Sequence, residues 1–315
     1  MNRRNLLTNA AATFGGAALI ATSGGHASAT TVAQKSTAVS YRGRSIILTR
    51  DGTELFYRDW GTDAPVIFLA GWALSSDFWA YQMGPLSDAG FRCIAYDRRG
   101  HGRSSDPGRG FDYDSLADDL ADVLNALDLT GVTLVAHSMG LGEAIRYLFR
   151  HGSQRVTRLA LVGPILPFPT KTPDNPEGTD PAVLEGFRRN VLQRDFPKWL
   201  DDNAGPFFVA DTSAGMVSWV KHMMLQCSMK AVVECNRTVT TTDFRGQLPR
   251  LRMPTIVIHG DRDASAPLDL TGRRVASLIP RARLEIYPGA PHGLPLTHSA
   301  QLNRDLLEFM TPRPR

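Results

Sequence analysis

The fold is decided by nine residues near the middle of the chain, Leu134-Val135-Ala136-His137-Ser138-Met139-Gly140-Leu141-Gly142. A continuous apolar run, typical of a strand buried on both faces, leads directly into a segment with helical periodicity. Ser138 therefore lies in a tight turn between a strand and a helix. The small residues Ala136 and Gly140 flank it and keep the adjacent backbones from clashing. The stretch predicts a strand, turn and helix that lift the Ser138 hydroxyl above the end of a buried sheet.

This turn resembles a nucleophile elbow, although a lone serine before a helix is more often an N-cap than a nucleophile. Two later loops favour the nucleophile. Asp261 and Asp263 follow an apolar run at residues 256–258, and His292 lies in a Gly/Pro loop near the C-terminus. The order Ser, Asp, His along the chain is the one expected of α/β-hydrolases.

Each of the three side chains has a separate chemical task. An alcohol is a weak nucleophile near neutral pH, so His292 is expected to take the Ser138 proton during attack. Asp263 is expected to orient the imidazole ring and to stabilise its cationic form. We prefer Asp263 because it comes later in its loop, further from the strand end. Asp261 is then expected to hold the turn, and changing each aspartate to Asn would decide between them.

A tetrahedral oxyanion needs two backbone N–H donors beside the nucleophile. The Met139 N–H, directly after Ser138, is one candidate. The other is the Trp72 N–H, in the Gly71-Trp72-Ala73 loop that follows an apolar run at residues 66–70. The alternative for Trp72 is a side chain that only packs in the core.

The rest of the chain alternates short apolar runs with amphipathic segments, which is typical of an α/β fold with a mostly parallel central sheet and helices on both faces. A hairpin with an Asp51-Gly52 turn is expected first, from strands at residues 45–48 and 54–58. Further strands are expected at residues 66–70, 93–96, 132–136, 159–162, 256–258 and 284–287. Helices are expected at residues 78–86, 113–127, 142–150, 268–278 and 300–309. The loops after the parallel strands should share one rim, where the active site is expected.

One long segment, residues 164–245, has no convincing buried strand and is expected to form a helical cap inserted after the sixth strand. It begins rich in proline and continues with aromatic residues and methionine at helical spacing. Such residues are more often plain packing than a binding wall, but a cap over the active-site rim would use some for both. The core of the hydrolase fold is then assigned to residues 41–163 and 246–315.

The first 29 residues have the order of an export signal. Arg3-Arg4 precede a weakly apolar, Ala/Gly-rich stretch, and Ala27-x-Ala29 provides the small residues that a signal peptidase accepts. The pattern is of the twin-arginine type, which predicts a periplasmic or secreted protein cleaved after Ala29. A stable membrane anchor is not expected, because the apolar run is shorter than the roughly 20 residues that span a bilayer. Residues 30–40 are expected to be a polar linker.

Composition and ligand patterns exclude several function classes. The net charge of +4 comes from scattered residues without a basic stripe, so nucleic acid is not an expected partner. No histidine or cysteine pattern indicates a metal site, and Gly140-x-Gly142 lacks the third small residue of a dinucleotide fingerprint, so no cofactor is expected. Of the three cysteines, Cys227 and Cys235 could pair in principle, but an eight-residue offset along a helix favours free thiols.

Over residues 46–312 the chain resembles the cofactor-free haloperoxidase and aryl-esterase group of α/β-hydrolases, which includes perhydrolases. The matching motifs are Gly71-Trp72, Ala95-Tyr96-Asp97-Arg98-Arg99-Gly100-His101-Gly102-Arg103-Ser104-Ser105, residues 114–119, residues 136–140, Thr242-Asp243-Phe244-Arg245, His259-Gly260-Asp261-x-Asp263 and Gly289-Ala290-Pro291-His292-Gly293. The resemblance implies that the second aspartate of its pair, Asp263, is the catalytic one.

Two departures from that group affect the expected activity. The family elbow usually begins with Gly where this chain has Ala136, and members that make peracids often carry Pro where this chain has Ala73. We therefore expect a carboxylester hydrolase of the aryl or short-chain type acting on a small-molecule ester, with perhydrolysis or haloperoxidation as a side activity at most. A lactonase, an amide hydrolase or a C–C bond hydrolase of the same fold is the alternative, as is a ligand-binding receptor on this scaffold. The sequence leaves the oligomeric state, including a homo-oligomer, open.

Overall fold

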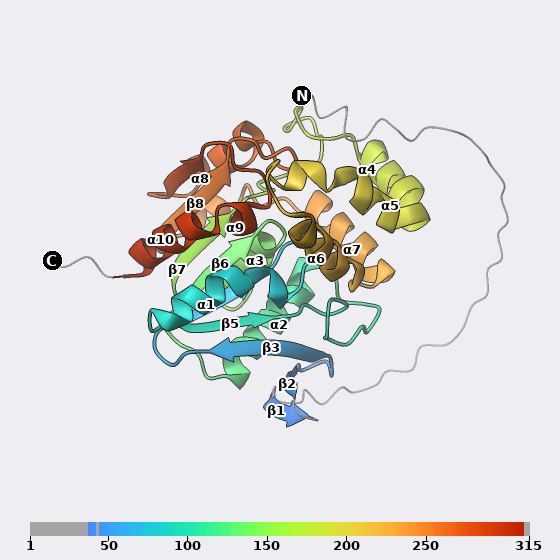
Figure 1. Cartoon of the computed structure of the whole chain (residues 1–315). Coiled ribbons are helices and arrows are strands. Elements are labelled where there is room, and N and C mark those ends of the chain that lie inside the picture. Colours follow the sequence, from blue (N-terminus) through green and yellow to red (C-terminus); the bar gives the residue numbers. More distant parts are fainter. Residues whose placement is uncertain (1–36, 42–43, 312–315) are drawn as a thin grey trace.

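The computed structural model describes residues 37–41 and 44–311, and in this part of the chain nine strands form one sheet in the order β1-β2-β3-β5-β4-β6-β7-β8-β9 (Figure 1). The strands are β1 (Thr37–Tyr41), β2 (Arg44–Leu48), β3 (Glu54–Trp60), β4 (Pro65–Leu69), β5 (Arg92–Tyr96), β6 (Val132–His137), β7 (Val156–Val162), β8 (Thr255–Gly260) and β9 (Arg283–Tyr287). The first three strands pair antiparallel, and β3 also pairs antiparallel with β5. All other neighbours pair in parallel, so their carboxyl ends share one rim.

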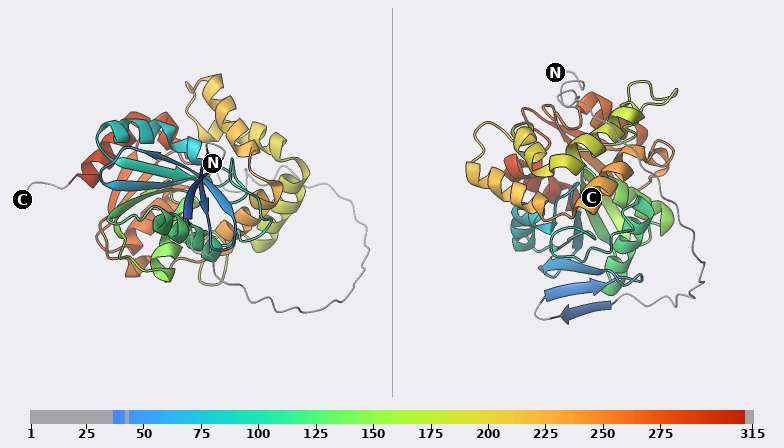
Figure 2. Two further views of the ribbon diagram at one scale, coloured as in Figure 1. Left: turned by 90° about the horizontal axis from the view of Figure 1, so that it is seen from below. Right: turned by 90° about the vertical axis from the view of Figure 1, so that its right-hand side faces the viewer.

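Helices cover both faces of the sheet (Figure 2). They are α1 (Ala80–Asp88) and α10 (Ser299–Met310) on one face, and α2 (Tyr113–Ala126), α3 (Gly140–Arg150) and α8 (Gly272–Leu278) on the other. Successive strand side chains point to opposite faces, so the apolar runs supply two cores at once. In β4, Ile67 and Leu69 join the core under α2 and α3, while Val66 and Phe68 join the core under α1 and α10.

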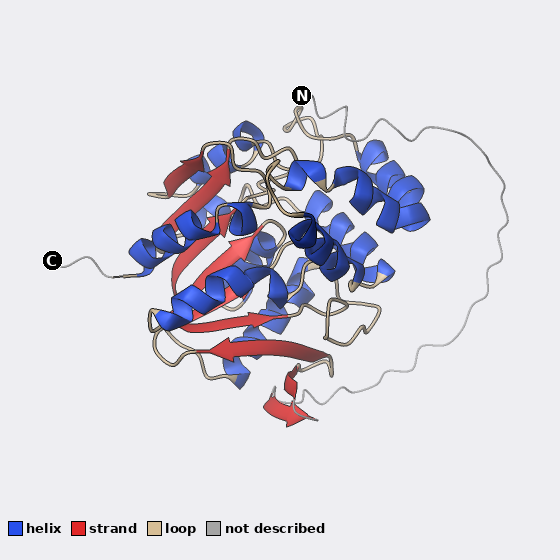
Figure 3. Cartoon of the chain, viewed as in Figure 1, coloured by secondary structure: helices blue, strands red, loops and turns tan. Residues whose placement is uncertain are grey.

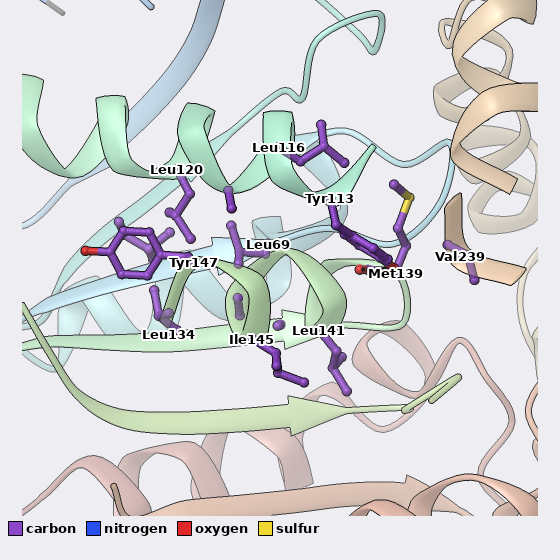
Figure 4. Packing of buried hydrophobic residues seen from close by; sticks show 14 of the residues in the cluster. Leu69, Tyr113, Leu116, Leu120, Leu134, Met139, Leu141, Ile145, Tyr147 and Val239 are labelled. Atoms are coloured by element: carbon purple, nitrogen blue, oxygen red, sulfur yellow. Dashed lines mark hydrogen bonds between the residues drawn. The ribbon is translucent and has the colours of Figure 1, made fainter. Parts of the chain in front are cut away.

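The packing between α2, α3 and β6 holds the turn at Ser138 in place (Figure 4). Leu120 points from α2 toward the sheet, and the ring of Tyr113 lies beside Met139, whose carbonyl accepts a hydrogen bond from the Tyr113 hydroxyl at 3.1 Å. A Cβ at position 142 would lie 2.1 Å from that ring. Position 142 must therefore be glycine for the Tyr113 ring to pack here. This packing accounts for Gly142 without a dinucleotide-binding role.

Between β7 and β8 the chain forms the cap, whose helices lie over one end of the sheet (Figure 3). They are α4 (Pro181–Phe187), η3 (Arg188–Leu192), α5 (Gln193–Asn203), η4 (Gly205–Phe207), α6 (Ala214–Leu225) and α7 (Met229–Thr241). The segment η3 is a single π-helical turn between α4 and α5. A short α9 (Leu294–Thr297) follows the loop that carries His292.

The structure has one strand more than the sequence predicts, because β1 occupies Thr37–Tyr41, at the end of the segment expected to be a linker. The cap consequently follows the seventh strand of the chain and not the sixth. The strand β1 pairs only with β2, at the edge of the sheet, where main-chain hydrogen bonds suffice and no apolar periodicity is needed. The predicted export signal at residues 1–29, and the linker as far as residue 36, lie outside the described residues.

Candidate active site

Ser138 occupies a strained turn directly after β6. Its φ is +52°, in the left-handed region that side chains other than glycine rarely adopt. Its N–H donates to the Val162 carbonyl at 3.0 Å, which ties the turn to β7. A Cβ at position 140 would lie 2.6 Å from the Leu69 carbonyl oxygen on β4, so Gly140 is the residue that lets α3 start this close to the sheet. The predicted strand, turn and helix are confirmed.

Ser138, His292 and Asp263 form one chain of hydrogen bonds. His292 Nε2 lies 2.9 Å from the Ser138 Oγ, and His292 Nδ1 lies 2.6 Å from Asp263 Oδ2. All three side chains are buried. A carboxylate can only accept, so Nδ1 carries a proton and Nε2 accepts from the Ser138 hydroxyl. This is the arrangement in which an imidazole can take a proton from an alcohol.

The two aspartates of the β8 loop have different partners. Asp261 Oδ1 accepts from the Gly289 N–H at 2.7 Å, so it joins the β8 and β9 loops and does not contact His292. Asp263 Oδ1 accepts from the Ala266 N–H at 2.7 Å, and His259 Nε2 lies 3.3 Å from Asp263 Oδ2. Burial alone would raise the pKa of Asp263, but His292 and His259 outweigh burial and lower it well below its usual range. Asp263 is therefore ionised near neutral pH.

His137, directly before Ser138, contacts the loop that carries His292. Its Nε2 lies 3.0 Å from the His292 carbonyl oxygen and donates to it. Burial, followed by the nearby His292, lowers the pKa of His137 to about 3, so the ring is neutral. Its ring centroid lies 4.8 Å from that of His292 and 4.9 Å from that of Phe78. His137 thus supports the backbone that carries His292.

Two backbone amides near Ser138 have no hydrogen-bond partner among the described residues. Neither the Met139 N–H nor the Trp72 N–H hydrogen-bonds to the described part of the chain, and both residues line the same cavity as Ser138. The Trp72 side chain does more than pack, because its Nε1 donates to the Val232 carbonyl of α7 at 2.8 Å and its ring contacts Trp199 edge-on. Trp72 therefore joins the core loop to the cap.

Arg98 orients the peptide that carries the Trp72 N–H. Its guanidinium donates to the Ala70 carbonyl at 2.9 Å and to the Gly71 carbonyl at 3.4 Å. In a trans peptide the C=O and N–H point in opposite directions. With the Gly71 carbonyl directed at Arg98, the Trp72 N–H points away from Arg98.

A cavity of about 260 Å³ lies between the rim of the sheet and the cap. This volume is just below the roughly 300–1,000 Å³ typical of sites for drug-sized ligands. Most of its wall is apolar, and its lining includes Trp72, Leu74, Ile165, Leu184, Phe187, Trp199, Phe207, Met224 and Val239. Polar side chains lie at Ser138 and His292, with Thr179, Asn236, Thr240 and Ser265 elsewhere on the wall. The site admits a small, mainly apolar molecule.

Comparison with known proteins agrees with this geometry. The family model described as alpha/beta hydrolase fold matches residues 64–299. The chain belongs to the α/β-hydrolases. It is 42% identical over 274 residues to "Non-heme chloroperoxidase CPO-A1" of Kitasatospora aureofaciens, covering 84% of this chain and 98% of that one. It is 36% identical over 272 residues to "Bifunctional esterase/perhydrolase DCH" of Acinetobacter calcoaceticus, with the same two coverages, 84% and 98%.

Solved structures of this fold superpose on nearly their whole length. A bromoperoxidase from Bacillus anthracis matches with a TM-score of 0.79 at 36% identity, covering 87% of this chain and 99% of its own. These relatives place the α/β-hydrolase within the non-heme haloperoxidase group, which agrees with the resemblance found in the sequence. The Acinetobacter calcoaceticus relative is named as both an esterase and a perhydrolase.

Sequence reasoning did not assign roles to three residues of this α/β-hydrolase site. His137 lies next to Ser138 in the sequence, and Arg98 lies inside one of the motifs that match the family. Each residue therefore had a signal in the sequence, but that signal does not say what the side chain contacts. Asn236 lies in the cap, where nothing in the sequence separates a cavity-lining amide from a surface one.

Other features of the described residues bear on binding. Cys93, Cys227 and Cys235 are buried free thiols, and burial raises the pKa of Cys93 and Cys235 to about 12. In the described part of the chain, no group of three or more His, Cys, Asp or Glu side chains is placed so that it could hold a metal ion. None of the helices in this part of the chain has the length and apolar character to cross a membrane.

Proposed function

We propose that this α/β-hydrolase is a carboxylester hydrolase that acts through an acyl-enzyme at Ser138. The observation that carries the proposal is the continuous hydrogen-bond chain from the Ser138 hydroxyl through His292 to the ionised Asp263. Ser138 and His292 of this hydrogen-bond chain line a mainly apolar cavity, which suits a small ester.

The first half of the reaction forms the acyl-enzyme. Ser138 Oγ attacks the ester carbonyl carbon while His292 Nε2 takes the hydroxyl proton, and Asp263 stabilises the imidazolium that results. The carbonyl oxygen becomes an oxyanion, for which the N–H groups of Met139 and Trp72 are the available donors. The bond from carbon to the alcohol oxygen then breaks, and His292 returns its proton to the leaving alcohol.

The second half releases the acid. A water molecule attacks the acyl carbon and gives a proton to His292 Nε2. The bond to Ser138 Oγ then breaks, and the serine oxygen regains that proton as the carboxylic acid leaves. Both halves need the same neutral imidazole, which the ionised Asp263 keeps in the tautomer that has its proton on Nδ1.

The test is hydrolysis of p-nitrophenyl esters from acetate to decanoate by residues 30–315 and by Ser138→Ala. We expect turnover by the unchanged protein and a loss of about 10³-fold or more in the variant. The chain-length profile would then measure the usable length of the cavity. A folded protein that leaves every ester intact would favour the lactonase, amide-hydrolase or C–C hydrolase alternatives.

Perhydrolysis is a second candidate activity, supported by the relative named as a bifunctional esterase/perhydrolase. In that reaction hydrogen peroxide would replace water as the attacking nucleophile on the acyl-enzyme, and the product would be a peracid. Peracid formation from acetate and peroxide, measured beside ester hydrolysis, would give the ratio of the two activities.

We also propose export through the twin-arginine-type segment at residues 1–29. Its support is the order of Arg3-Arg4, the weakly apolar stretch and Ala27-x-Ala29. With Arg3 and Arg4 both changed to lysine, the protein should stay in the cytoplasm. The unchanged protein should be exported and should lose residues 1–29. Fractionation of cells followed by N-terminal sequencing would check both results.

A further inference from the structure

The cavity has a polar end formed by the cap. Asn236 and Thr240 of α7 both line it, and they are four residues apart, on the same face of the helix. Thr179 lines it from the loop before α4. The wall that carries these residues also includes the apolar side chains of Leu184 and Val239. A polar group in an otherwise apolar wall sets the orientation of a ligand.

Arg188 determines which way the Asn236 amide points. The Arg188 side chain is only 4% exposed, and its Nη1 donates to Asn236 Oδ1 at 3.2 Å and to Thr240 Oγ1 at 3.0 Å. A guanidinium can only donate, so the amide oxygen must face Arg188 and the Nδ2 group must face away. Asn236 Nδ2 donates to no residue in the described part of the chain. Its N–H donors are therefore the ones offered to the cavity.

The neighbouring hydroxyls differ in what they offer. The Thr240 hydroxyl donates to the Asn236 carbonyl at 2.9 Å and accepts from Arg188, so it is already engaged. The Thr179 hydroxyl makes no hydrogen bond with a described residue, while its backbone is held by Pro169 and Lys171 at 2.8 Å each. Asn236 and Thr179 are thus the two groups with free donors at this end.

The Arg188 guanidinium has a carboxylate partner inside the cap. Glu185 Oε2 lies 3.0 Å from Arg188 Nη2 and also accepts from Arg237 Nη1 at 2.6 Å. The group that Arg188 orients is a neutral amide. A ligand at this end therefore meets neutral N–H and O–H donors, and a neutral oxygen acceptor needs less desolvation there than a carboxylate does.

The contacts of Arg188 depend on a π-helical turn, which is a rare element. Arg188 is the first residue of the π-helical turn η3, and such turns occur often at functional sites. The wider turn places the buried guanidinium against α7, where Asn236 lies.

We propose that this part of the cavity is a subsite for a neutral oxygen acceptor on the substrate other than the ester group that is cleaved. The preferred substrates are then small esters whose apolar acyl chain carries a carbonyl or ether oxygen. The inference rests on the proposed esterase activity and names its substrate class. A purely hydrocarbon chain would cover the Asn236 N–H groups without replacing the water that they lose, which is unfavourable.

The experiment compares p-nitrophenyl esters that differ in one group. The 4-oxopentanoate is paired with the 4-methylpentanoate and the 5-oxohexanoate with the 5-methylhexanoate, and mono-p-nitrophenyl glutarate places a carboxylate where the second ketone lies. We expect kcat/KM for at least one oxo ester to exceed that of its methyl partner by about 5- to 10-fold, and to exceed that of the glutarate ester.

Asn236→Asp removes the N–H donors while keeping an oxygen for Arg188, so the oxo-to-methyl ratio should fall to about one or below. The ratio is taken on one protein sample, so it does not depend on the fraction that is folded. Asn190→Asp, an exposed residue of the same π-helical turn, carries the same charge change and should keep the ratio of the unchanged protein.

The outcomes separate the two proposals. Hydrolysis of both members of each pair at equal rates, with ratios that Asn236→Asp does not alter, overturns the subsite and leaves the esterase standing. A preference for the glutarate ester overturns the neutral-acceptor inference, because it would mean that the site favours a carboxylate. No turnover of any ester overturns the proposed function together with the subsite.

Discussion

The Arg98 guanidinium and the Glu143 carboxylate form an ion pair at 2.8 Å in which the two side chains are 3% and 1% exposed. Arg98 lies after β5 and Glu143 lies in the first turn of α3. The pair joins the helix that follows Ser138 to the loop whose carbonyls Arg98 also binds. One buried ion pair thus joins α3 to the loop that carries Trp72.

We predict that Arg98→Met, alone, lowers the free energy of unfolding by about 3–5 kcal/mol, since it leaves the Glu143 charge buried without a partner. The double variant Arg98→Met/Glu143→Gln should regain most of that stability, because Gln still accepts from the Tyr96 hydroxyl and carries no charge. Its kcat should nevertheless stay about 10-fold or more below that of the unchanged protein, because the Ala70 carbonyl loses its contact with Arg98 and the Gly71 carbonyl keeps only the Leu74 N–H as donor. Urea unfolding and p-nitrophenyl acetate kinetics measure the two effects. A double variant with full kcat would show that Arg98 has only a structural role.

A second prediction concerns Ala73, which is buried and has a φ of +60°. Proline holds φ near −65°, so Ala73→Pro cannot keep the present loop. We expect ester hydrolysis to fall by about 10²-fold as the Trp72 N–H moves, since one oxyanion donor is worth about 10²–10³ in kcat. Ala73→Gly, which adopts positive φ readily, is the matched control and should retain activity within a few-fold. An active Ala73→Pro protein would show that the loop tolerates a second conformation.

The elements that the sequence predicted are those with a local signal. The buried strands and the turn at Ser138 have uninterrupted apolar runs and small residues at required positions, and parallel pairing brings the ends of β6, β8 and β9 to one rim. The meeting of Ser138, Asp263 and His292 follows from that topology. The strand β1 was missed because an edge strand needs only backbone pairing. The contact of Arg188 with Asn236 joins residues 48 positions apart through a π-helical turn, which no apolar pattern marks.

A third prediction follows from two buried histidines. Burial, with the charge of Arg98 next in size, lowers the pKa of His101 to about 3, and His137 has the same value. An unfolded histidine binds its proton below a pH of about 6.5, so between that pH and about 3 the unfolded state holds more protons. Stability should therefore fall as the pH falls, by about 1.4 kcal/mol per pH unit for each histidine.

His101→Gln should reduce that slope by about one histidine's share between pH 6 and 5, above the range in which most carboxylates titrate. Urea unfolding at several pH values measures it. His101 does not line the cavity, so ester hydrolysis at pH 8 reports whether the variant has kept its fold. An unchanged slope in a folded variant would mean that His101 takes up its proton in the native state as well.

The last prediction separates the two aspartates of the β8 loop by the same substitution. At position 263, Asn keeps the shape of the side chain but loses the charge that stabilises the imidazolium of His292, and its amide favours the wrong tautomer of that ring. We expect kcat for Asp263→Asn to fall by about 10⁴-fold, as in comparable sites. At position 261, the Asn oxygen can still accept from the Gly289 N–H, so Asp261→Asn should stay within a few-fold of the unchanged kcat. Steady-state hydrolysis of p-nitrophenyl acetate, with circular dichroism to compare the folds, measures both. If Asp261→Asn were the damaged variant, the charge partner of His292 during turnover would have to be Asp261, and the loop would have to rearrange when substrate binds.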